Sequence, residues 1–111
     1  MPEEPFFIKQ NDTVQALVRD LKDAFGSPVN ITGATVAFSM RVKPAGSVKV
    51  NAAAGTVVDG GLGRIRYPFT SSDTDTADTF EAEIQVTYSD GGVQTFPNDG
   101  YFDVIIIDDI G

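Results

Sequence analysis

Two glutamates, Glu81 and Glu83, are the side chains whose type and spacing first suggest chemistry. Apolar and polar residues alternate around them, so both carboxylates project from one side of a strand, about 6.5–7 Å apart. Carboxylates at about that separation serve inverting glycosidases as general acid and general base. Acidic residues at alternate positions are also common on a solvated strand face, and no cleft is indicated that would raise either pKa. We therefore expect the pair to be a solvated face.

Three aspartates in the loop SSDTDTAD, Asp73, Asp75 and Asp78, are the best candidates for a metal site. Their oxygen atoms are the ligands that Ca²⁺ prefers. The EF-hand pattern fails, because Asp78 and Ile84 stand where that motif needs its glycine and its final glutamate. We expect a polar loop rather than a calcium site.

Histidine and cysteine are both missing from the chain. Their absence removes the commonest general base, a thiolate nucleophile and a zinc–thiolate site. The sequence GGLG at 60–63 lacks the lysine and the strand-to-helix context of a phosphate loop, so it is predicted to be a turn. Asp108 and Asp109 are expected to be solvated. We therefore expect no enzyme activity, no catalytic residue, no cofactor and no metal.

The tyrosines are the candidates for a sugar-stacking surface. By alternation, Tyr67 and Tyr88 point inward and are expected in the core, whereas the position of Tyr101 is left open. A carbohydrate-binding module would need exposed aromatic side chains around a groove, and the sequence supplies few.

The overall charge of the chain limits its partners. The 111 residues, of which 41% are hydrophobic and 22% charged, fit one globular domain with a formal net charge of −8. Such a charge argues against a nucleic acid partner and against an anionic membrane surface. No run of about 20 apolar residues is present, so no membrane span is expected. The start, MPEEPFF, lacks a signal-peptide pattern, so secretion by that route is not expected.

Short alternating segments separated by turn signals predict an all-β fold. The clearest are 80–88 and 35–42, where Val36, Phe38 and Met40 share one face and Arg41 lies on the opposite, polar face. Further strands are predicted at 6–10, 48–50, 56–59, 64–69, 93–96 and 101–108, and the sequence NAAAG at 51–55 is predicted to be a loop. Pro68 predicts an edge or bulged strand. About seven or eight strands with turns every eight to twelve residues indicate an antiparallel, immunoglobulin-like β-sandwich.

The segment VQALVRDLKDAF at 14–25 fits two structures. Val14, Leu17, Leu21 and Phe25 lie near helical spacing, but the segment also alternates as a strand does. We prefer a strand, because the surroundings are β and the segment ends at a Gly-Ser-Pro turn. Residues 1–5 are expected to form an N-terminal arm, and 6–111 a single domain.

Four segments, in order, resemble the N-terminal domain of phage baseplate upper proteins. They are FIKQNDTVQALVRDL, DAFGSPVNITGATVAFSMR, GRIRYPFTSSDT and FEAEIQVTYSDGGVQTFP, within about residues 6–107. Ile31 and Ile65 stand where the family has Leu and Val. The resemblance implies an immunoglobulin-like structural part of a tailed-phage virion without catalysis. In longer members further segments connect this domain to other virion parts, whereas this sequence ends at Gly111. A baseplate or tail adaptor and a capsid decoration protein are therefore both left open, and the alternative function is a carbohydrate-binding module that aids host adsorption.

The last strand has an unusual pattern. Phe102, Val104 and Ile106 share one face, and the opposite face carries apolar residues around a single Asp103. An arm or loop of the chain is one possible cover, and another protein is the second, because a contiguous apolar patch usually marks a contact site. Our hypothesis is a subunit interface formed by Phe6, Phe7, Tyr101, Ile105 and Ile107, in a homo-oligomer or with other capsid, tail or baseplate proteins of the virion.

Overall fold

The computed structural model describes residues 4–98 and 100–110, which form nine strands and no helix. The strands are β1 (Phe6–Lys9), β2 (Ala16–Asp20), β3 (Thr35–Val42), β4 (Val48–Ala54), β5 (Thr56–Asp59), β6 (Arg64–Pro68), β7 (Asp78–Thr87), β8 (Val93–Phe96) and β9 (Phe102–Ile107). The expected all-β sandwich is confirmed. Among these residues no helix is long and apolar enough to cross a membrane. The expected arm lies partly outside the described residues, which begin at Glu4.

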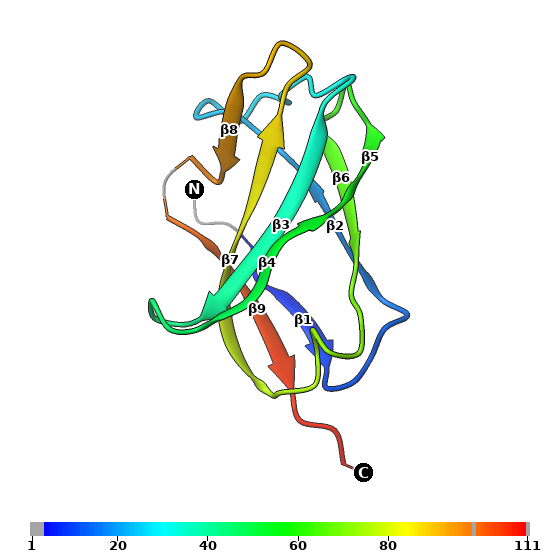
Figure 1. Cartoon of the computed structure of the whole chain (residues 1–111), viewed down its shortest axis with the longest axis vertical. Coiled ribbons are helices and arrows are strands. Elements are labelled where there is room, and N and C mark those ends of the chain that lie inside the picture. The colour runs from blue at the N-terminus through cyan, green and yellow to red at the C-terminus, as the bar shows by residue number, and fades with distance from the viewer. Residues whose placement is uncertain (1–3, 99, 111) are drawn as a thin grey trace.

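Two sheets pack face to face (Figure 1). The large sheet has the order β1-β9-β7-β3-β4, and β8 also pairs with β7. β9 pairs with the first half of β7 and β8 with its second half, so these two strands follow one another along the same edge of β7. The small sheet has the order β2-β6-β5. All strand pairs are antiparallel except β1 with β9, which is parallel and makes the large sheet mixed.

The alternation of β3 and β7 builds the centre of the core. Phe38 and Ile84 face each other across this pair and are each 1% exposed. The Phe38 ring stacks on Tyr67 of the small sheet at 4.5 Å and meets the edge of Phe69 at 5.7 Å. These contacts join the two sheets, because apolar faces of both are removed from water together.

The ambiguous segment at 14–25 forms strand β2, so the preference for a strand is confirmed. Leu17 and Leu21 are buried, while Val14 and Phe25 are more than 90% exposed. The helical pattern was misleading because the two residues that extended it lie in loops outside the strand.

Two local predictions were wrong. The expected loop at 51–55 is mostly strand, since β4 continues to Ala54 and pairs Ala53 with Phe38. Small residues continue this strand to Gly55, where the chain crosses to the small sheet. β6 is not an edge strand but the middle strand of that sheet. Pro68 is tolerated because it ends β6, beyond the residues that pair with β5.

Candidate functional site: the outer face of the large sheet

The parallel pairing of β1 with β9 brings three of the predicted interface residues together. Phe7 is paired in register with Ile105, and Lys9 with Ile107. Phe102, Val104 and Ile106 are buried in the core, so the intervening residues of β9 face outward, as their alternation predicts. Phe7 is 50% exposed and Ile107 is 40% exposed, while Ile105 is partly buried. We call Phe7, Ile105 and Ile107 the apolar strip.

Phe6 does not belong to this surface, which corrects its place in the predicted interface. Its ring stacks on Phe69 at a centroid distance of 5.5 Å and packs against the core. Neighbouring residues of a strand point to opposite faces, so only one of Phe6 and Phe7 can face outward. The register with β9 selects Phe7, because Phe6 pairs with the buried Val104.

The strip is not covered by the described part of the N-terminal arm. The carbonyl of Glu4 accepts a hydrogen bond from the Arg19 side chain on β2, in the small sheet. β1 itself lies beside β9 in the sheet rather than over its outer face. The described residues therefore leave Phe7 and Ile107 open to solvent.

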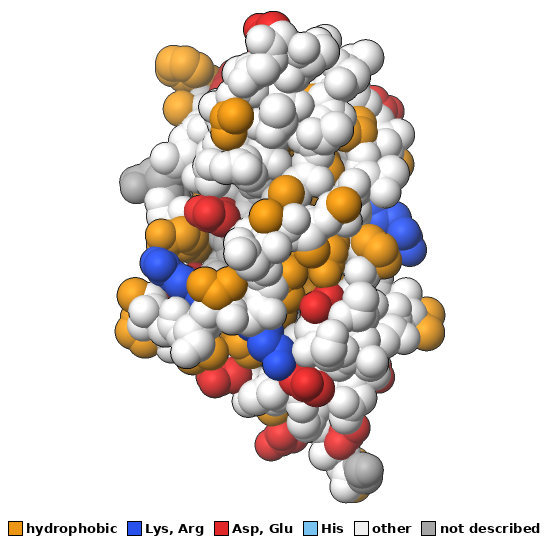
Figure 2. All heavy atoms as spheres, in the orientation of Figure 1, with side chains coloured by type: hydrophobic (Ala, Val, Ile, Leu, Met, Phe, Trp, Pro, Cys, Tyr) orange, Lys and Arg blue, Asp and Glu red, His pale blue; other side chains and the backbone are white. Residues whose placement is uncertain are grey.

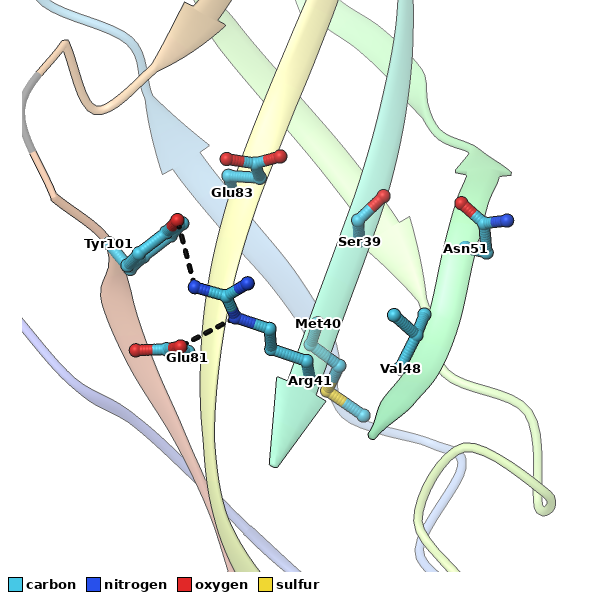
Figure 3. Close-up of a pocket in the computed structure, with 8 residues that line it drawn as sticks. All are labelled: Ser39, Met40, Arg41, Val48, Asn51, Glu81, Glu83 and Tyr101. Carbon is cyan, nitrogen blue, oxygen red and sulfur yellow. Dashed lines mark hydrogen bonds and ion pairs between the residues drawn. The ribbon is translucent and has the colours of Figure 1, made fainter. Parts of the chain in front are cut away.

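A polar cluster lies next to the strip on the same sheet, since Asp103 belongs to it and shares the outward face of β9 with Ile105. Figure 3 shows the part of the cluster formed by Arg41, Glu81 and Tyr101. Arg41 extends from β3 and donates from its Nε to Oε1 of Glu81 at 2.6 Å and from a terminal nitrogen to the Tyr101 hydroxyl at 3.0 Å. Its guanidinium also lies 4.8 Å from the centroid of the Tyr101 ring. Lys43 forms an ion pair with Asp103 at 3.0 Å. These contacts hold Tyr101, which is 43% exposed, at the edge of the cluster.

Glu81 is more enclosed than its alternating position predicted. It is 9% exposed, and its carboxylate accepts the backbone N–H of Ala45 at 2.8 Å in addition to Arg41. The Ala45 hydrogen bond, together with Arg41, lowers the pKa of Glu81 below its ordinary value. A general acid needs a raised pKa instead. The prediction that both glutamates lie on a solvated face is therefore wrong for Glu81, whose carboxylate is kept ionised by its neighbours.

A shallow pocket of about 180 Å³ opens beside this cluster. Glu83 and Asn51 line it, from β7 and β4, and neither side chain has a hydrogen-bond partner or ion pair among the described residues. One face of the Tyr101 ring is occupied by Arg41. The pocket therefore offers polar groups but only a partly covered aromatic surface.

The three aspartates of the 71–78 loop have separate partners. Asp73 is buried and accepts hydrogen bonds from the Tyr67 hydroxyl at 2.6 Å and from the backbone N–H of Thr70 at 3.0 Å. Asp75 forms an ion pair with Lys49 at 2.5 Å. The carboxylate of Asp78 accepts the N–H of the next residue. Within 4–98 and 100–110 no group of three acidic, histidine or cysteine side chains is arranged to hold a metal ion.

The tyrosines are dispersed through the domain. Tyr67 is 4% exposed in the core, where burial and the hydrogen bond to Asp73 raise its pKa. Tyr88 is partly buried and its hydroxyl donates to Gln94. The inward positions predicted for both are confirmed, and Tyr101 alone of the three lies at the outer surface.

Basic side chains are few and scattered over the face shown in Figure 2, with apolar side chains among them. Within the described residues, the basic side chains that form ion pairs with carboxylates include Arg41, Lys43, Lys49 and Arg64. These pairings could not be predicted from the sequence, although alternation places Arg41 on the polar side of β3. No protein-family model and no curated protein matches the chain.

Proposed function

We propose that this chain is a non-enzymatic structural protein of a tailed-phage virion, acting in subunit assembly as a baseplate or tail adaptor or as a capsid decoration protein. The observation that carries the proposal is the apolar strip, which stays partly exposed after the sandwich has closed. Apolar surface left exposed on a sheet face favours burial against another subunit. The phage context rests on the resemblance of the four sequence segments.

An immunoglobulin-like topology is part of this proposal, and the strand order supports it. The small sheet, β2-β6-β5, takes the places of strands B, E and D of an immunoglobulin domain. In the large sheet, β9-β7-β3 takes the places of G, F and C, and β4 lies beside C. β8, which pairs with the second half of β7, is an addition to that arrangement.

The net charge of −8 sets conditions on the contact. Copies of the chain repel one another at low salt, so assembly needs apolar contacts or a more basic partner. The strip meets the first condition, since Phe7, Ile105 and Ile107 carry no charge. Homo-oligomers and complexes with other virion proteins both satisfy these conditions, whereas nucleic acid and membranes do not attract so acidic a chain.

A carbohydrate-binding module is the alternative, and it has less support. Sugar stacking requires open aromatic faces, but Tyr67 is in the core and Arg41 covers one face of Tyr101. Binding to a glycan array that is lost on changing Tyr101→Ala, with the mass in solution unaltered, would favour this alternative over assembly.

The double variant Ile105→Thr with Ile107→Thr tests the proposal. Threonine keeps the β-branched shape and removes apolar surface, so the monomer should fold while incorporation into particles falls. The matched control is Val58→Thr with Val93→Thr, which changes two valines, each more than half exposed and outside the strip. Equal incorporation of the double variant and the control would remove the strip from assembly.

A further inference from the structure

β1 is an edge strand of the large sheet, and one of its sides has no strand beside it. It pairs only with β9 among the strands of residues 4–98 and 100–110. An unpaired edge presents backbone N–H and C=O groups that can bond to a strand of another chain. This edge lies directly beside the apolar strip, to which β1 contributes Phe7.

The register shows which residues have groups at the free edge. The N–H of Gln10 donates to the carbonyl of Ile107 at 2.7 Å, in continuation of the parallel pairing. In a parallel pair every second residue of a strand bonds to a given neighbour. Ile8, like Gln10, therefore bonds to β9, and the backbone groups of Phe7 and Lys9 point to the free side.

The donors and acceptors of this edge match an antiparallel copy of itself. With Phe7 opposite Phe7 of the second copy, each Phe7 N–H donates to the other Phe7 carbonyl, and Lys9 stands opposite Pro5. The N–H of Lys9 then donates to the Pro5 carbonyl. Pro5 has no N–H to donate to the Lys9 carbonyl, but that carbonyl already accepts the N–H of Asp12 at 3.1 Å. No backbone group of the pair is left without a partner.

We propose that two copies of this chain join edge to edge through β1, antiparallel about a two-fold axis at Phe7, so that their large sheets become one continuous sheet. This inference rests on the proposed assembly function and names its partner, a second copy. Such an interface is isologous and closes on itself as a dimer.

The side chains also favour a second copy of the chain as the partner. The two Phe7 rings become direct cross-strand neighbours on the outer face, where aromatic pairs stabilise a sheet. Each ring extends the apolar strip of its own copy, so the two strips merge into one surface across the axis. Lys9 makes no ion pair within the described residues and lies on the same face as Phe7, so its positive charge stands beside the Phe7 pair and offsets part of the repulsion between two acidic subunits.

The test removes one backbone donor without changing the fold of the monomer. Lys9→Pro deletes an N–H that points to the free edge, whereas the matched control, Lys9→Ala, removes the same charge and keeps the N–H. Sedimentation equilibrium of the full chain should show a dimer whose Kd rises about tenfold or more in the proline variant relative to the alanine variant, because two symmetry-related bonds are lost. Circular dichroism checks that both variants fold.

Amide hydrogen exchange of the unmodified chain gives an independent readout. The Phe7 and Lys9 amides should become at least about tenfold more protected as concentration rises through the Kd, while the Ile8 and Gln10 amides are protected throughout. A chain that is monomeric at all concentrations, or a dimer in which Phe7 and Lys9 exchange at monomer rates, overturns edge pairing. A third outcome is a dimer that is lost when Ile105 and Ile107 are changed to threonine but whose Kd is unchanged by Lys9→Pro. That outcome overturns edge pairing and leaves the strip as the contact.

Discussion

Phe7 and Ile105 lie side by side across the parallel pair of β1 and β9, and both side chains point out of the sandwich. The two residues are far apart in the sequence, so the apolar surface they share exists only in the folded chain. On the same sheet, Arg41, Glu81, Lys43 and Asp103 form ion pairs. In the proposed assembly the apolar strip would supply the dry part of the contact and the polar cluster beside it part of the polar rim.

Salt should strengthen self-association of this chain. Raising the ionic strength from about 20 mM to about 200 mM screens the repulsion between subunits of charge −8, while apolar contacts are retained. We expect a lower Kd by sedimentation at the higher salt concentration. Assembly that weakens with salt would instead indicate a contact made mainly by opposite charges.

Glu81→Gln should destabilise the domain more than Glu83→Gln. Glu81 accepts hydrogen bonds from Arg41 and from the Ala45 backbone, whereas Glu83 makes no hydrogen bond or ion pair among the described residues. Thermal unfolding followed by circular dichroism compares the two variants. Equal melting temperatures would show that the Arg41–Glu81 pair contributes nothing to stability.

Stability should fall as the pH is lowered into the acid range, and Glu81 should account for part of the loss. Its folded-state pKa is lowered from 4.5, chiefly by the Ala45 N–H, and those of Asp20 and Asp75 are lowered from 3.8. A lowered folded pKa means that the unfolded chain takes up protons first. The stabilisation is therefore present above the unfolded value and is lost as pH falls through the folded one. Urea titrations from pH 7 to about pH 3 should show a shallower decline in Glu81→Gln.

Tyr67→Phe should cost about 1–3 kcal/mol of unfolding free energy, because the buried Asp73 carboxylate loses the hydroxyl that donates to it at 2.6 Å. Tyr88→Phe is the matched control, since its hydroxyl donates to Gln94 from a partly buried position. Urea unfolding of both variants measures the difference. An equal, small cost in the two would mean that Asp73 is satisfied without Tyr67.

Much of the fold could be predicted from the sequence because alternation is strict in the long strands. The inward residues of β3 and β7 and the inward Phe102, Val104 and Ile106 of β9 are buried as their pattern predicts. The pattern failed where it was short or composed of small residues. The alanines of β4 give only a weak hydrophobic pattern. Val14 and Phe25 produced an apparent helical spacing, although both lie in loops and are exposed.

The candidate site could be predicted only in part, because it depends on which strands are neighbours. Alternation gave the outward face of β9 but did not distinguish Phe6 from Phe7, since that choice is made by the register with β9. Likewise, Arg41 and Glu81 were both expected on polar faces. Their ion pair requires β3 to lie beside β7 in one particular register, and residue periodicity carries no information on pairing partners.

Oxidative footprinting of the apolar strip, by hydroxyl radicals and mass spectrometry, tests the central claim most directly. The isolated subunit and the same protein in assembled particles would be compared at Phe7, Ile105 and Ile107, with the exposed Phe25 as the internal reference. We predict that oxidation of the strip falls severalfold in the particle while Phe25 serves to normalise the dose. Oxidation of the strip that is the same in the free and assembled protein would contradict a contact through this face.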